Sequence, residues 1–79
     1  MSIDYASMLT DAQKRQLVEN RLAQFAAEAY QYSLNKKTAE SIQNEQQIEA
    51  ADKALAILEA AIAVHQEELS KLPITEPEA

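Results

Sequence analysis

Residues 48–72 read IEAADKALAILEAAIAVHQEELSKL, and this stretch decides the fold. One seam of residues recurs in it at alternating steps of three and four: Ile48, Ala51, Leu55, Leu58, Ile62, His65, Leu69 and Leu72. All of them except Ala51 and His65 are large and apolar. This spacing places the seam along one side of an α-helix, as in a helix that packs lengthwise against another. We therefore predict a second helix alongside.

The composition contains nothing that breaks a helix before residue 73. The chain of 79 residues has no glycine, and its two prolines are Pro73 and Pro77. Because glycine and proline disfavour helices most strongly, an all-α fold is expected. A chain this short buries little surface by itself, so self-association or docking into a helical bundle is expected to complete its core.

A capping box predicts where the partner helix begins. The Thr10 side chain can accept a hydrogen bond from the Gln13 backbone, and the Gln13 side chain can reach back to the Thr10 backbone. The seam positions that follow are Val18, Leu22, Phe25, Ala29 and Tyr32, and then Lys36 and Ala39. The apolar seam of this helix therefore weakens toward its end.

The polar stretch 35–47 leaves two alternatives open. In the first, one long helix continues through it as a rod. In the second, the chain bends near residues 41–45, where Asn44 and Gln47 could form a second capping arrangement.

A register test favours the hairpin. If the chain reverses between residues 43 and 44, each seam residue of one helix faces a seam residue of the other, with Leu22 opposite His65. Small residues then often lie opposite large ones, as close packing prefers. The same register brings Arg21 near Glu68. We therefore predict two long antiparallel helices in a coiled-coil-like hairpin. The predicted organisation is a lead-in arm (1–9), a helical hairpin (10–72) with helices at about 11–42 and 45–71 and a turn at about 43–45, and an extended acidic tail (73–79).

A two-helix hairpin can cover only one stripe of each helix, yet the sequence has more apolar positions than that. The second helix carries Ala50, Ala54, Ile57, Ala61 and Val64 beside its seam, and the first carries a fainter set, Ala23, Ala27, Tyr30 and Leu34. Exposed apolar strips commonly mark contact with another subunit. We predict that these positions face a partner or another copy, with Tyr30 as a candidate aromatic anchor. Two hairpins forming a four-helix bundle are the simplest closure.

Composition argues against several classes of function. The net charge of −6 disfavours nucleic acid, whose phosphates require a basic surface. The chain lacks the glycine-rich loop that cradles phosphates, and it has no cysteine for thiolate chemistry. His65, the only histidine, is preceded by Ile62 where the metal sites of helical bundles place Glu. We therefore expect no enzyme, no cofactor, no metal and no small-molecule substrate, and interpret His65 as a packed seam residue.

Charge is unevenly distributed along the chain. Residues 1–37 carry five basic and four acidic side chains, whereas residues 38–79 carry two and nine. These charges favour packing of the first half of the chain against the second. They disfavour packing of two acidic second halves against each other. No apolar run has the length of a membrane span, and the N-terminal residues do not resemble a signal peptide. A cytoplasmic location, or one within an intracellularly assembled particle, is expected.

In style the chain is similar to small helical-hairpin proteins encoded among bacteriophage structural genes, with Thr10 to Leu34 as one capped helix and Ile48 to Leu72 as the other. The resemblance implies a role in a virus particle and transfers no residue roles. The leading hypothesis is a non-catalytic structural or assembly protein that self-associates and docks into a larger protein complex. The alternative is a small acidic adaptor, or a regulatory or inhibitor protein, that binds one partner protein through an exposed helix face.

Overall fold

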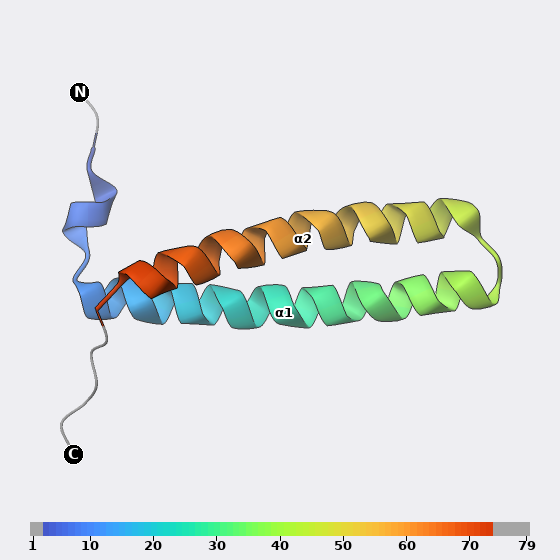
Figure 1. The fold of residues 1–79 in the computed structure, drawn as a ribbon, viewed down its shortest axis with the longest axis horizontal. Helices are drawn as coiled ribbons and strands as arrows, with labels where there is room; N and C mark the ends of the chain where they lie inside the picture. Colours follow the sequence, from blue (N-terminus) through green and yellow to red (C-terminus); the bar gives the residue numbers. More distant parts are fainter. Residues whose placement is uncertain (1–2, 74–79) are drawn as a thin grey trace, which may run out of the picture.

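The computed structural model describes residues 3–73 and shows a helical hairpin. A short 3-10 helix, η1 (Tyr5–Met8), precedes two long helices, α1 (Asp11–Ser41) and α2 (Glu45–Lys71). The two helices lie side by side and antiparallel, in a single layer (Figure 1). The described residues contain no strand. The prediction of an all-α hairpin is confirmed, and the continuous rod is excluded.

The capping box predicted at the start of α1 is present. Thr10 Oγ1 accepts a hydrogen bond from the Gln13 backbone N–H at 3.1 Å, and Gln13 Oε1 accepts one from the Thr10 N–H at 2.9 Å. These bonds satisfy backbone donors that have no partner within the helix. Because a cap of this kind contributes about 1 kcal/mol, it fixes the first residue of α1.

The turn between the helices is a Schellman motif fused to an N-cap. The Asn44 N–H donates to the Ala39 carbonyl at 2.9 Å, and the Gln43 N–H donates to the Glu40 carbonyl at 3.1 Å. Gln43 adopts a left-handed conformation with φ of 57°. Asn44 Oδ1 then accepts the N–H of Gln47 at 3.1 Å, so the second predicted cap is also present. One residue, Asn44, thus takes part in ending α1 and beginning α2.

The core is a single line of contact between the helices. Its buried members are Ala39, Ala51 and Leu58. The other seam residues are half-buried, apart from Tyr32, whose exposed fraction is 37%. The half-buried seam residues are Val18, Leu22, Phe25, Ala29, Lys36, Ile48, Leu55, Ile62, His65, Leu69 and Leu72. Every seam position except Tyr32 is therefore buried or half-buried in the hairpin.

Contacts across the hairpin place α1 and α2 close to the predicted register. The rings of Phe25 and His65 meet edge to face with centroids 4.8 Å apart, so His65 packs one turn from the Leu22 expected opposite it. The Arg21 guanidinium lies 5.2 Å from the centroid of the Phe25 ring. In the described part of the chain, Arg21 and Glu68 form no ion pair with each other. Glu68 forms an ion pair with Lys71. Arg21 thus stacks on its own helix rather than reaching across the flank.

The segments outside the two helices add little to the core. Asp4 caps η1 by accepting the Ser7 N–H at 3.3 Å, while Ile3, Tyr5 and Met8 are exposed. The predicted acidic tail lies outside the described residues, apart from Pro73. Neither of the long helices in the described part of the chain has the apolar stretch that crossing a bilayer requires.

The left-handed residue in the turn gives a direct stability test. A residue with a Cβ is disfavoured in this conformation, by about 1 kcal/mol relative to glycine. We expect Gln43→Gly to raise the free energy of unfolding by about 0.5–1 kcal/mol, measured by urea denaturation at fixed protein concentration. The matched control is Gln46→Gly in the first turn of α2, where helical φ gives glycine no advantage and the same change should destabilise the protein. A lower stability for Gln43→Gly would contradict this account of the turn.

Candidate functional site

The histidine that sequence analysis weighed as a metal ligand has its Nδ1 atom committed elsewhere. His65 Nδ1 lies 2.7 Å from the Ala61 carbonyl oxygen. Because a carbonyl can only accept, Nδ1 carries the hydrogen and donates it. The ring is half-buried against Phe25. Among residues 3–73, no group of three or more His, Cys, Asp or Glu side chains is placed to hold a metal ion.

The larger of the two apolar surfaces is on α2, and we call it the α2 stripe. It consists of Ala50, Ala54, Ile57, Ala61 and Val64. Ile57 and Val64 project most, with exposed fractions of 72% and 60%. Ala54 and Ala61 are half-buried because they lie nearest the seam. The alanines beside these two branched side chains make a surface into which another helix can pack closely.

A second apolar surface lies on α1, and we call it the α1 stripe. It consists of Ala23, Ala27, Tyr30 and Leu34, all exposed. Tyr30 has an exposed fraction of 67% and Leu34 of 43%. The two stripes share the same four-three-four spacing, which keeps each on one side of its helix.

The two stripes lie on different sides of the hairpin. Leu17 of α1 and Val64 of α2 line one shallow groove of about 250 Å³, so they share a side. At 100° per residue, Leu17 and Tyr30 point about 140° apart around α1. The α1 stripe therefore faces away from the side that carries the α2 stripe. The sequence predicts that both stripes contact a partner or another copy, and the structure places them on different sides.

The same groove contains a residue that sequence analysis did not select. Leu17 is half exposed, although it belongs to neither the seam nor a stripe. Leu9 and Leu72 line the groove with it, and Lys14, His65 and Glu68 supply polar atoms. Leu17 directly precedes the seam residue Val18. The sequence alone does not show which side of the hairpin Leu17 is on, because that depends on how α2 packs against α1.

One ion pair joins the two helices at the turn end. Lys36 Nζ lies 2.7 Å from Asp52 Oδ1, with both side chains partly in solvent. The hydrogen bond to Asp52, with the attraction between the two charges, raises the pKa of Lys36 above its ordinary value of 10.5. Lys36 occupies a seam position of α1. Its ammonium group extends to the edge of the seam, where it meets Asp52, the residue after the seam residue Ala51. A cation on the seam is thereby satisfied without being buried.

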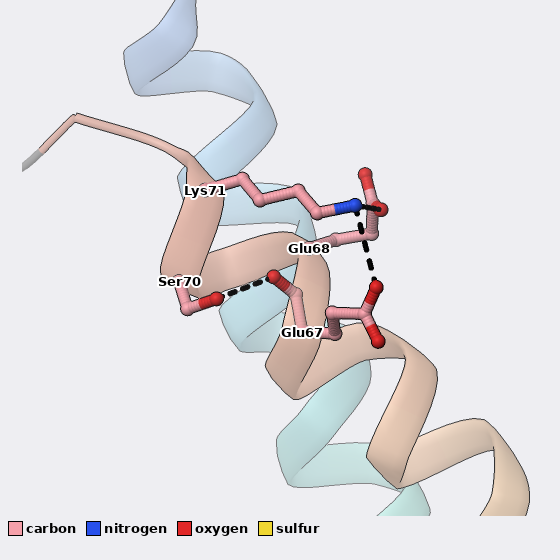
Figure 2. Close-up of polar contacts among 4 residues, drawn as sticks. All are labelled: Glu67, Glu68, Ser70 and Lys71. Atoms are coloured by element: carbon pink, nitrogen blue, oxygen red, sulfur yellow. Dashed lines mark hydrogen bonds and ion pairs between the residues drawn. The ribbon is translucent and has the colours of Figure 1, made fainter.

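A second charged cluster closes the C-terminal turn of α2. Lys71 Nζ lies 3.3 Å from a Glu67 oxygen and 3.4 Å from a Glu68 oxygen (Figure 2). Hydrogen bonds to Glu67 and then Glu68, together with their charges, raise the pKa of Lys71. The Ser70 hydroxyl donates to the Glu67 carbonyl at 2.7 Å. A cation in the last turn also suits the negative end of the helix dipole.

Comparison with known proteins gives no match: no family model fits the chain, and no curated protein or solved structure is significantly similar to it. The function is therefore inferred from the chain's own residues.

The Lys36–Asp52 pair predicts how stability depends on pH. Because folding raises the pKa of Lys36, its contribution is fully present below pH 10.5 and is lost as the pH rises through the higher folded value. We expect the urea midpoint of the natural protein to fall more steeply above pH 10.5 than that of Lys36→Met. Lys37→Met is the control, because Lys37 forms no ion pair within residues 3–73. Equal slopes for the natural protein and Lys36→Met would show that the pair does not stabilise the hairpin.

Proposed function

We propose that this chain is a non-catalytic structural subunit that self-associates through its exposed apolar stripes and is built into a larger protein assembly. The observation that carries the proposal is the missing second layer. Among the described residues only Ala39, Ala51 and Leu58 are buried, and the shortest dimension of the molecule is 14 Å. Ile57 and Tyr30 remain in solvent on helices that have no other covering element in the described residues.

The energetics support association. Covering a side chain as large as Ile57 contributes roughly 1–2 kcal/mol, and several such residues together approach the whole stability of a small domain. Folding a pair of long helices costs the conformational entropy of many residues and buries only one line of contact. The core of the hairpin alone therefore gives a small free energy of unfolding. Packing the stripes against further helices would supply the apolar burial that the isolated hairpin lacks.

The identity of the larger assembly rests on the sequence alone. The style shared with hairpins encoded among bacteriophage structural genes favours a virus particle, and this part of the proposal stays a prediction. An adaptor function would use the same stripes for a different protein. The two differ in whether the purified chain associates with itself.

Two neighbouring residues on α2 separate folding from association. Leu58 is buried at the seam with an exposed fraction of 8%, whereas Ile57 projects into solvent. Leu58→Asp should unfold the hairpin, with a loss of about 3 kcal/mol or more, because it places an unpaired charge in the core. Ile57→Asp should keep the helical circular dichroism and reduce the mass measured by light scattering.

The natural protein should be an oligomer in the same measurement. A folded monomer at all concentrations would remove the support for a structural subunit and favour the adaptor. Unfolding by Ile57→Asp as severe as that by Leu58→Asp would contradict this separation of the α2 stripe from the seam.

A further inference from the structure

We propose that copies of this chain associate head to tail, with the α2 stripe of one copy packed antiparallel against the α1 stripe of the next. This inference rests on the proposed function, because it specifies how the self-association is built. It also replaces the symmetric four-helix bundle expected from the sequence.

The placement of the stripes is the first argument. They lie on different sides of the hairpin, so a two-fold dimer that joins like faces cannot bury both. Packing α2 against α2 would leave Tyr30 and Leu34 in solvent. A head-to-tail contact, by contrast, covers both stripes of every interior copy. Such a contact closes into a ring or continues as a filament.

Charge is the second argument. Helix α2 carries six acidic and two basic side chains, whereas α1 carries four acidic and five basic ones. An α2–α2 contact would bring two strongly acidic helices together, and an α2–α1 contact avoids this. The intramolecular contact has the same character, since its ion pair joins Lys36 of α1 to Asp52 of α2.

Shape is the third argument. In an antiparallel alignment with Ala27 opposite Ile57, Tyr30 faces Ala54 and Leu34 faces Ala50. Ile57, Tyr30 and Leu34 then each meet an alanine, as close packing requires. A parallel alignment that sets Ala27 opposite Ala54 instead sets Tyr30 against Ile57. Antiparallel packing also alternates the helix dipoles throughout the assembly.

A mixing experiment tests the proposal. Ile57→Asp should disable the α2 stripe and Tyr30→Asp the α1 stripe, and both residues are exposed enough to leave the hairpin folded. We expect light scattering to give the monomer mass for each variant alone. An equimolar mixture should give twice that mass and nothing larger, because one intact contact remains. Gln24→Asp, an exposed change on α1 outside both stripes, should keep the mass of the natural protein.

Other outcomes would overturn the proposal in distinguishable ways. If Tyr30→Asp keeps the natural mass while Ile57→Asp dissociates, the contact joins α2 to α2 and self-association still stands. If both variants are monomers and their mixture is too, the stripes do not bind each other. If the natural protein is itself a monomer, both this inference and the proposed function fail.

Discussion

Two helices in contact can hide only one side of each from water, and this limit governs the whole molecule. The seam supplies that contact, with Leu58 buried at its middle and Ala51 and Ala39 buried near the turn. Small residues at the turn end let the helix backbones approach closely enough for a short connection. Everything apolar that lies off the seam is consequently left on the surface, which is why exposed Ile57 and Tyr30 are the informative residues.

The turn shows how strictly a short connection constrains its residues. Gln43 has the left-handed backbone that usually belongs to glycine, and Asn44 serves both helices. A continuous helix through this region would have avoided the cost of the left-handed residue. The hairpin is nevertheless preferred, because a rod would expose the apolar seams of both helices along their full length.

Most of the fold could be predicted from the sequence because its signals are local. The cap at Thr10, the absence of glycine and the three-four spacing of the seam each act within one or two turns of helix. The surface was harder to predict. The stripes could be named from the sequence as apolar positions off the seam, but whether Tyr30 and Ile57 share a side depends on how one helix is rotated against the other. Arg21 was expected to lie near Glu68; it stacks on Phe25 and forms no ion pair with Glu68 in the described residues, since a nearby ring on the same helix is reached with less loss of side-chain freedom.

Association would add to the stability that the seam gives the hairpin. A neighbouring copy in the proposed assembly would bury the apolar area that the hairpin leaves uncovered, and it would stabilise the folded chain by mass action. In the proposed assembly, the uneven charge of the two helices would favour contact between α2 and α1, because two acidic α2 helices repel each other. Such an arrangement would suit a structural subunit. A contact between unlike faces can be repeated from copy to copy, whereas a two-fold contact is complete in a dimer.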